Sequence, residues 1–181
     1  MNGTVQLHTK RLLLRKVTPE DAAILHRELG CNPEMIRYTC WNPYATSEST
    51  RAKVESDIQG YQKEGCYACI IQFGENIIGT IGAYGYDSEM SSIELGYSVF
   101  QKYWGQGFAA EAVGEVVRYL IMDEKINRVH AWCHADNTAS AKVLVHAGMK
   151  KEGLLRQAMR NPDGSYADQK LFGIVREDYV I

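Results

Sequence analysis

The sequence has little excess of either charge and no long apolar run. Its 181 residues carry 20 Lys and Arg against 22 Asp and Glu, a formal net charge of −2. The molecule as a whole therefore has no electrostatic attraction for nucleic acid, and we expect no direct nucleic-acid binding. No apolar stretch reaches the roughly 20 residues that a membrane-spanning helix needs. Because the first residues, Met1 to His8, also lack the apolar core of a secretory signal peptide, we expect no membrane association and a cytoplasmic protein.

The residues that build disulfide frameworks and metal centres are few and scattered. Five cysteines leave at least one unpaired in any disulfide scheme, which suits a reducing compartment. Cys66 and Cys69 form a CxxC, but no second pair of Cys or His lies at zinc-site spacing, and the segment continues as an apolar strand. The five histidines show no HExxH pattern. We therefore expect reduced thiols and no metal site.

The chain shows no internal repeat, no low-complexity segment and no linker, and its length suits one domain with a sizeable core. Apolar periodicity and turn residues predict strands at 11–17, 66–73, 77–86, 92–100, 127–134, 149–159 and 166–175. They predict helices at 18–30, from 32, and at 46–63, 109–122 and 137–148. This order predicts an α/β (α+β) fold with a mixed, mostly antiparallel central sheet flanked by helices.

The most informative stretch is the turn between the strand 92–100 and the helix 109–122. Gly105 and Gly107 lie in this turn, one residue apart. A strand that turns through glycines into a helix leaves backbone N–H groups without intrachain partners, and the helix dipole makes that end positive. Such a turn favours a phosphate or pyrophosphate. Alone it is also typical of a plain tight connection, since it lacks the ribose-binding acid of a dinucleotide fold and the Gly-Lys-Ser/Thr of a Walker loop.

Four blocks of sequence follow one another in a recognisable order. They are Thr9–Arg15 with Thr18–Ala22, Glu94–Tyr97 with Tyr103–Ala112, Asn137–Ser140 with Ala147–Met149 and Glu152–Gly153, and Asp168 in the last hairpin. This combination resembles the GNAT superfamily of N-acetyltransferases, in particular the branch of ribosomal-protein alanine N-acetyltransferases. The resemblance runs from Arg11 to about Tyr179 and implies a single N-acetyltransferase domain over residues 1–181. It departs from the superfamily pattern at Trp104, where Gln or Arg is usual, although an aromatic residue is common in this branch.

The resemblance implies acetyl-CoA as the cosubstrate and no metal. Backbone amides of the glycine turn would hold the pyrophosphate, and this stretch consists of Trp104, Gly105, Gln106, Gly107, Phe108, Ala109 and Ala110. The pantetheine arm would lie beside Val99 like an added strand, as extended ligands do at sheet edges. Asn137 would hydrogen-bond a pantetheine amide, and a helix cap is the alternative role for its side chain.

Acetyl transfer to an amine needs a base, because an alkyl ammonium is protonated near neutral pH. Glu94 is the candidate base, acting directly or through water. The alternative interpretation is that Glu94 is only an exposed residue of its strand. A backbone N–H near Tyr97 or Val99 would meet the developing oxyanion. Many members of the superfamily carry a tyrosine acid where this chain has Leu144. The resemblance suggests Ser140 as the group that hydrogen-bonds or protonates the thiolate, and a helix-surface hydroxyl is the alternative.

The sequence does not distinguish between classes of acceptor amine. A peptide N-terminus, a polyamine, an amino sugar and a free amino acid all remain alternatives. Candidates to line an acceptor cleft or attract a cation are Trp41, Tyr84, Tyr86, Tyr97, Glu94 and Asp168. The first hypothesis is transfer of an acetyl group from acetyl-CoA to a primary amine by direct attack in a ternary complex. The alternatives are a non-catalytic CoA-binding or sensor module of the same fold and a protein that uses the turn for another nucleotide. The branch also allows a homodimer.

Overall fold

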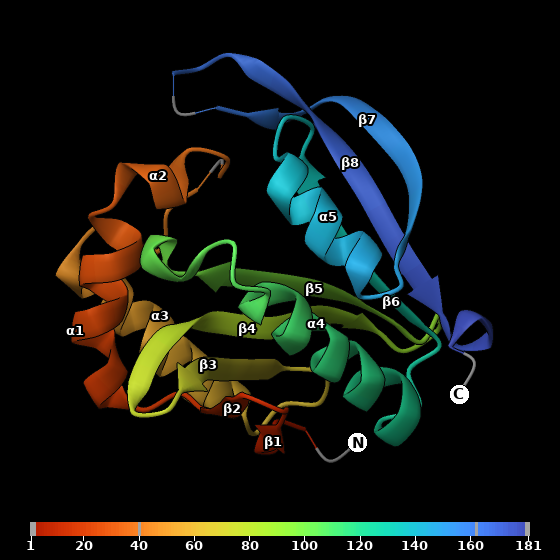
Figure 1. Cartoon of the computed structure of the whole chain (residues 1–181), viewed down its shortest axis with the longest axis horizontal. Helices are drawn as coiled ribbons and strands as arrows, with labels where there is room; N and C mark the ends of the chain where they lie inside the picture. The colour runs from red at the N-terminus through yellow and green to blue at the C-terminus, as the bar shows by residue number, and fades with distance from the viewer. Residues whose placement is uncertain (1–2, 40, 162, 180–181) are drawn as a thin grey trace.

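One sheet contains all the strands of the computed structural model, which describes residues 3–39, 41–161 and 163–179. The strands follow the order β1-β2-β3-β4-β5-β6-β8-β7 (Figure 1). Their bounds are β1 Leu7–His8, β2 Leu12–Lys16, β3 Tyr67–Phe73, β4 Asn76–Asp87, β5 Ser92–Val99, β6 Arg128–His134, β7 Lys150–Arg160 and β8 Tyr166–Val175. Neighbouring strands are antiparallel except β5 and β6, which are parallel. The predicted mixed, mostly antiparallel sheet is therefore confirmed.

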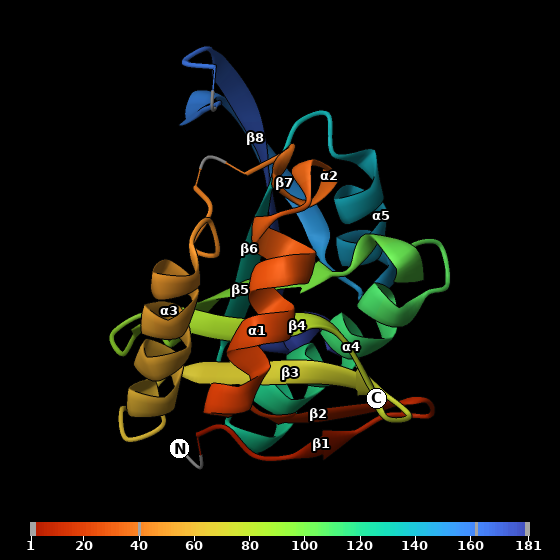
Figure 2. The ribbon, with the colours of Figure 1, turned by 90° about the vertical axis from the view of Figure 1, so that its left-hand side faces the viewer.

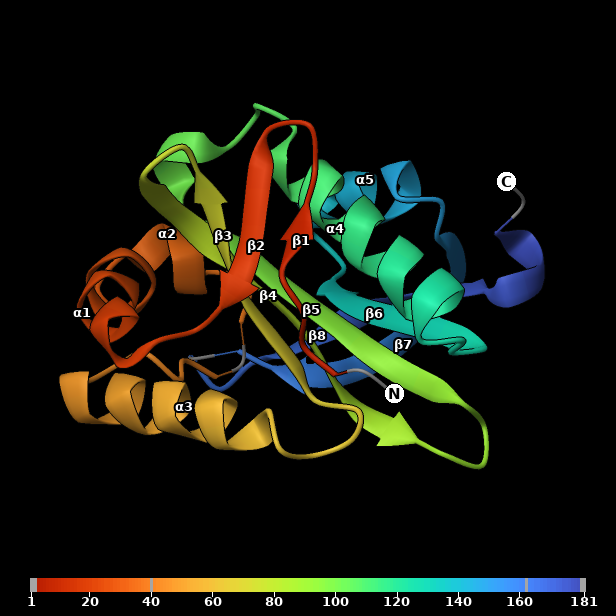
Figure 3. The same ribbon diagram turned by 90° about the horizontal axis from the view of Figure 1, so that it is seen from below.

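Helices cover both faces of this sheet. Their bounds are α1 Ala22–Leu25, α2 Pro33–Ile36, α3 Ser47–Gly60, α4 Phe108–Arg118 and α5 Thr138–His146. Seen from below, α1 and α3 lie on one side of the sheet and α4 and α5 on the other (Figure 3). In the turned view of Figure 2, α1 lies in front of the strands and α3 to their left, whereas α4 and α5 lie toward the right. The fold class predicted from the sequence is thus observed in three dimensions.

The helix starts follow the capping residues in the sequence. The side chain of Thr46 accepts from the Ser49 N–H at 3.0 Å, and Ser49 Oγ accepts from the Thr46 N–H at 2.9 Å, so this reciprocal box begins α3. The predicted helix 18–30 is less regular than expected. It opens as a 3-10 turn at Pro19–Asp21 and ends in a π-helical turn at His26–Gly30. The helix after the glycine turn likewise ends in a π-helical turn, Tyr119–Asp123.

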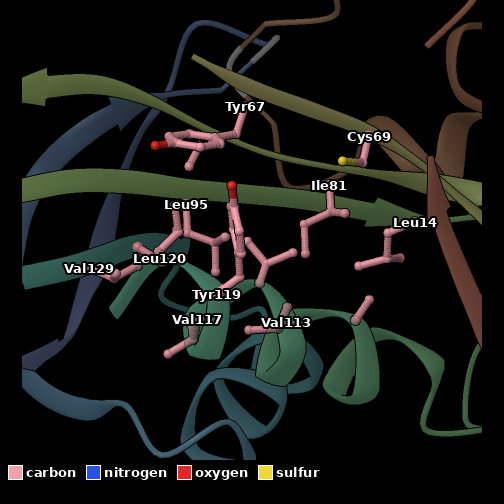
Figure 4. Packing of buried hydrophobic residues seen from close by; sticks show 14 of the residues in the cluster. Leu14, Tyr67, Cys69, Ile81, Leu95, Val113, Val117, Tyr119, Leu120 and Val129 are labelled. Atoms are coloured by element: carbon pink, nitrogen blue, oxygen red, sulfur yellow. The ribbon is translucent and has the colours of Figure 1, made fainter. Parts of the chain in front are cut away.

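Two apolar clusters fill the space between the sheet and its helices. Figure 4 shows Val113, Val117 and Leu120 of the α4 segment beneath the strand residues that they contact, and all three are fully buried. Their spacing of four and three residues places them on one helix face. On the other face of the sheet, Leu25 and Val54 belong to a smaller cluster with β3. Because β3 is buried on both faces, its sequence is a continuous apolar run rather than an alternating one.

The feature of the fold that positions the site is a split between β5 and β6. The two strands pair over only three positions, from Ser92 opposite Arg128 to Glu94 opposite His130. Beyond Glu94, β5 pairs with β4 and β6 pairs with β8. The C-terminal half of β5 therefore has one sheet edge without a strand partner, on the side where α4 and α5 contact each other.

Some features of the described chain lie outside the sequence predictions. The two-residue strand β1 pairs with β2 at Leu7 opposite Leu14 and is too short to give a pattern of its own. Cys31, Cys66, Cys69 and Cys133 are free thiols, whereas Cys40 lies outside the described residues. None of the helices in the described part of the chain combines the length and apolar character that crossing a bilayer requires.

Candidate active site

The glycine turn lies between β5 and α4, where the sequence predicts it. A 3-10 turn, Gln101–Tyr103, follows β5, and Gly105 and Gly107 then adopt φ angles of +74° and +79°. Such left-handed backbone favours glycine because a side chain is strained there. The first helical bond of α4 runs from the Glu111 N–H to Gly107 O at 3.1 Å. The amides at the start of α4 therefore have no intrahelical partner and lie at the positive end of the helix dipole.

β5 presents backbone donors on the side where it has no partner strand. The Phe100 N–H donates to Ile78 O on β4 at 2.7 Å, and alternation along an antiparallel ladder turns the backbone groups of Tyr97 and Val99 to the opposite side. The indole Nε1–H of Trp104 donates to Val99 O at 2.6 Å. The Val99 carbonyl therefore already has a hydrogen-bond partner. The N–H groups of Tyr97 and Val99 remain as donors for an extended ligand at this edge. The residues present fit a pantetheine arm and a diphosphate.

A cavity of about 730 Å³ opens beside the same strand. The residues predicted from the sequence that line it are Trp41, Tyr84, Glu94, Tyr97 and Ser140. Both candidate catalytic residues, Glu94 and Ser140, thus share one pocket with three of the four candidate aromatic acceptor residues. Of the residues predicted to bind the cofactor, Ser140 lines this pocket, whereas the glycine turn, Val99 and Asn137 do not.

Glu94 lies half-buried at the point where β5 and β6 separate. Its cross-strand neighbour on β4 is Tyr84, and its neighbour on β6 is His130. The ring of Tyr84 leans along β5 toward Gly96, and a Cβ at Gly96 would stand 1.8 Å from the Tyr84 hydroxyl. Burial, with a contribution from the charge of Glu94, raises the pKa of Tyr84 to about 12. The base candidate therefore shares its surroundings with a neutral phenol.

Ser140 is joined to Tyr97 across the split. Its Oγ lies 2.9 Å from the Tyr97 hydroxyl, and the carbonyl of Ser140 lies 3.2 Å from the same hydroxyl. Burial raises the pKa of Tyr97 to about 12, although the hydrogen bond with Ser140 opposes this shift. A neutral phenol thus stands beside the hydroxyl that the sequence indicates as the proton donor, a pairing that the sequence did not predict.

Three further residues named from the sequence have structural contacts. The side chain of Asn137 accepts from the Ser140 N–H at 3.0 Å, so it caps α5, as its alternative interpretation predicts. Asp168 Oδ1 accepts from the N–H of Gln157, whose φ is +51°, at 2.9 Å. Tyr86 packs over Gly65, where a Cβ would stand 2.2 Å from Tyr86 Cβ. Asp168 and Tyr86 do not line the cavity.

Sequence reasoning missed the far wall of the cavity. Lys53 and Asp57 of α3 line it and form an ion pair at 2.5 Å, with side chains 30% and 18% exposed. Tyr44 also lines it, and burial, with a contribution from Asp57, raises the pKa of Tyr44 to about 12. The spacing of Lys53 and Asp57 by four residues is the one sequence signal for this pair. It indicates a helix surface and says nothing of a pocket.

Comparisons with known proteins agree with this geometry. A family model described as "Acetyltransferase (GNAT) domain" matches residues 11–150. The protein named Uncharacterized N-acetyltransferase p20 of Bacillus licheniformis is 31% identical over 96% of this chain and 97% of its own length. The [Ribosomal protein uS5]-alanine N-acetyltransferase of Escherichia coli (strain K12) is 26% identical over 97% of this chain and 93% of its own length.

Solved structures show the same fold. The structure of RimL, described as a ribosomal L7/L12 alpha-N-protein acetyltransferase in complex with coenzyme A, superposes with a TM-score of 0.86 at 21% identity. The superposition covers 94% of this chain and 98% of that chain. At this identity the likeness shows the fold, and the family model and p20 carry the assignment. The resemblance in the sequence motifs is confirmed, and the chain belongs to the GNAT acetyltransferase family.

Proposed function

We propose that this protein transfers an acetyl group from acetyl-CoA to a primary amine by direct attack in a ternary complex, within one N-acetyltransferase domain over residues 1–181. The observation that carries the proposal is the arrangement along β5. The strand leads from Glu94 in the acceptor pocket, past the backbone N–H groups of Tyr97 and Val99 that face away from β4, to the glycine turn at α4. An activated acyl group and an amine could thus meet beside one rigid element.

The cosubstrate supplies a thioester, whose acyl carbon is open to attack by nitrogen. The amides at the start of α4 would hold the diphosphate, and the N–H groups of Tyr97 and Val99 would hold the pantetheine arm and the carbonyl oxygen. Asn137 positions α5 through its Oδ1, which caps the helix, and its Nδ2–H groups are the part of the side chain that would donate to a pantetheine carbonyl. Ser140, in the first turn of α5, lines the pocket and is assigned to the leaving sulfur.

The chemistry balances when the amine nitrogen loses two protons and the leaving sulfur gains one. Glu94 removes the first proton from the ammonium, directly or through water, and the free amine attacks the acyl carbon. As the C–N bond forms and the C–S bond breaks, the nitrogen loses its second proton to water. The departing thiolate takes a proton from Ser140, and the neutral Tyr97 hydroxyl 2.9 Å away can replace that proton. Leu144, which is fully buried at the place of the superfamily's tyrosine acid, takes no part.

The acceptor class is a primary amine with an apolar or aromatic body, because Trp41, Tyr84 and Tyr97 line the pocket together with apolar residues of the α1 segment. Relatives of this chain include the ribosomal-protein alanine and serine acetyltransferases of Escherichia coli (strain K12). An acceptor panel should therefore hold peptides that begin with alanine or serine beside diamines, amino sugars and amino acids. Family membership argues against the nucleotide-binding alternative. The cytoplasmic location and the homodimer stay predictions, for fractionation and light scattering to test.

The substitution Glu94→Gln tests the proposal against a non-catalytic CoA-binding module. We expect acetyl-CoA affinity to stay unchanged and thiol release with the best acceptor to fall about a hundredfold to ten-thousandfold, because the base is lost. Calorimetry measures the first quantity and a thiol assay the second. Glu89→Gln is the matched control, since Glu89 is exposed in the turn between β4 and β5. Full activity of Glu94→Gln would eliminate this base, and acetyl-CoA binding by wild type with no thiol release for any amine would favour the sensor.

A further inference from the structure

The turn assigned to the diphosphate is held from one side by Arg11, just before β2. Arg11 Nη1 donates to Gln106 O at 3.1 Å, and the guanidinium carbon lies 4.4 Å from the centre of the Phe108 ring. Phe108 in turn packs against Phe73 with ring centres 4.8 Å apart. These contacts fix both the Gln106 carbonyl of the turn and the first side chain of α4 to the edge of the sheet.

The same arginine pairs with an acid in the first turn of α4. Arg11 Nε donates to Glu111 Oε2 at 2.7 Å, while Glu111 Oε1 accepts from Thr9 Oγ1 at 2.6 Å and from the Arg11 backbone N–H at 2.8 Å. Burial alone would raise the pKa of Glu111, but the hydrogen bonds from Thr9 and Arg11 outweigh it and hold the pKa below its usual value. The carboxylate is therefore charged and fixed in place.

A charged carboxylate at this position creates a conflict for a diphosphate site. It interacts favourably with the helix dipole when no ligand is present, but it repels an anion bound at the same helix end. The guanidinium of Arg11 offsets that charge. Its Nη2 lies 3.5 Å from where a Cβ of Gly107 would stand, so the positive charge is beside the turn.

We propose that Arg11 is a positioning residue for the diphosphate of acetyl-CoA. By binding the Gln106 carbonyl, Arg11 keeps the backbone N–H groups of the turn oriented toward the diphosphate, and by pairing with Glu111 it neutralises that negative charge. The inference rests on the proposed acetyl-CoA site. It assigns a role in cofactor binding to one residue of the first motif block, Arg11, which precedes Gln106 of the turn by 95 residues in the chain.

Calorimetric titration of the full chain with CoA, 3′-dephospho-CoA and pantetheine tests this role. We expect Arg11→Gln to weaken CoA and 3′-dephospho-CoA alike, by about threefold to tenfold, because both carry the diphosphate. Pantetheine, which has no phosphate, should bind as it does to wild type. In the variant, Thr9 Oγ1 and the backbone N–H of residue 11 still donate to the Glu111 carboxylate, so the negative charge of Glu111 stays near the ligand. Arg11→Gln with Glu111→Gln should therefore regain part of the lost affinity, and the regained part should shrink at high salt.

Arg15→Gln is the matched control. Arg15 lies on β2, four residues after Arg11, and makes two hydrogen bonds to Asp21, at 2.7 and 2.9 Å. It should lower the melting temperature and leave CoA affinity unchanged. Wild-type affinity of Arg11→Gln for CoA, a loss confined to CoA that spares 3′-dephospho-CoA, or a double variant as weak as Arg11→Gln would each overturn the role. Wild-type protein that binds neither nucleotide would instead overturn the proposed function itself.

Discussion

At the residue scale, the absence of a side chain at Gly96 leaves space for the ring of Tyr84. The Tyr84 hydroxyl occupies the space that a Cβ at position 96 would need, at 1.8 Å, and Tyr84 Cζ would stand 3.0 Å away. Tyr84 is 47% exposed, yet this end of its ring lies in the pocket beside Glu94. The absence of a side chain at 96 therefore places a phenol against the proposed base.

Gly96→Ala should displace Tyr84 without unfolding the protein, because the far end of a ring can move. We expect the KM for the acceptor to rise about tenfold, equivalent to about 1.4 kcal/mol, with CoA affinity unchanged. Steady-state kinetics and calorimetry measure the two quantities. Tyr84→Phe, which keeps the ring, separates the hydroxyl from the shape of the pocket. An unchanged acceptor KM in Gly96→Ala would show that Tyr84 does not contact the acceptor.

At the element scale, α4 has one glycine at its N-cap and another inside it, in opposite situations. Gly107 begins the helix with φ of +79°, whereas Gly114 lies inside it, and a Cβ at Gly114 would meet nothing within 4 Å. At Gly107 the backbone conformation itself requires glycine. At Gly114 glycine only adds conformational freedom to the unfolded chain, which weakens the helix.

Alanine substitutions should therefore act in opposite directions at these two positions. Gly107→Ala should lose about 1–2 kcal/mol of unfolding free energy and weaken CoA, because the turn amides must reorient. Gly114→Ala should gain about 0.5–1 kcal/mol and leave CoA affinity unchanged. Denaturant unfolding and calorimetry of both variants check the pair. Equal CoA affinity in Gly107→Ala and Gly114→Ala would contradict a role of the turn in binding.

At the scale of the whole molecule, the sequence predicted the positions of seven of the strands along the chain and of the glycine turn, because both have local causes. Apolar periodicity marks the strands, and Gly105 and Gly107 mark the turn. The pocket wall formed by Lys53 and Asp57 could not be predicted, since it depends on α3 packing against distant strands. The pairing of Ser140 with Tyr97 likewise arises from the split between β5 and β6, which leaves no mark in either segment.

The sheet consists of two parts, β1 to β5 and β6 to β8, which are joined by only three residue pairs between β5 and β6. The stability of the part formed by β6, β7 and β8 therefore depends mainly on contacts among these three strands. Arg128 on β6 reaches Glu152 on β7 at 2.5 Å across β8, where Gly173 leaves room: a Cβ there would stand 2.4 Å from Glu152 Oε1. The hydrogen bond from Arg128 lowers the pKa of Glu152. The pKa of the neighbouring His130 is lowered, mainly by burial and also by the positive charge of Arg128. The negative charges of Glu94 and Glu152 act in the opposite direction but do not outweigh this effect.

The signs of these shifts predict acid sensitivity in this part of the molecule. A carboxyl with a depressed folded pKa stabilises the fold above its unfolded pKa and loses that effect as pH falls through the folded value. Glu152→Gln should lower the melting temperature near pH 7, and its difference from wild type should shrink as pH falls below about 4.5. Glu177→Gln, at an exposed position, should match wild type throughout. A difference between Glu152→Gln and wild type that stays constant from pH 7 to pH 3 would mean that packing, not the ion pair, joins β6 to β7.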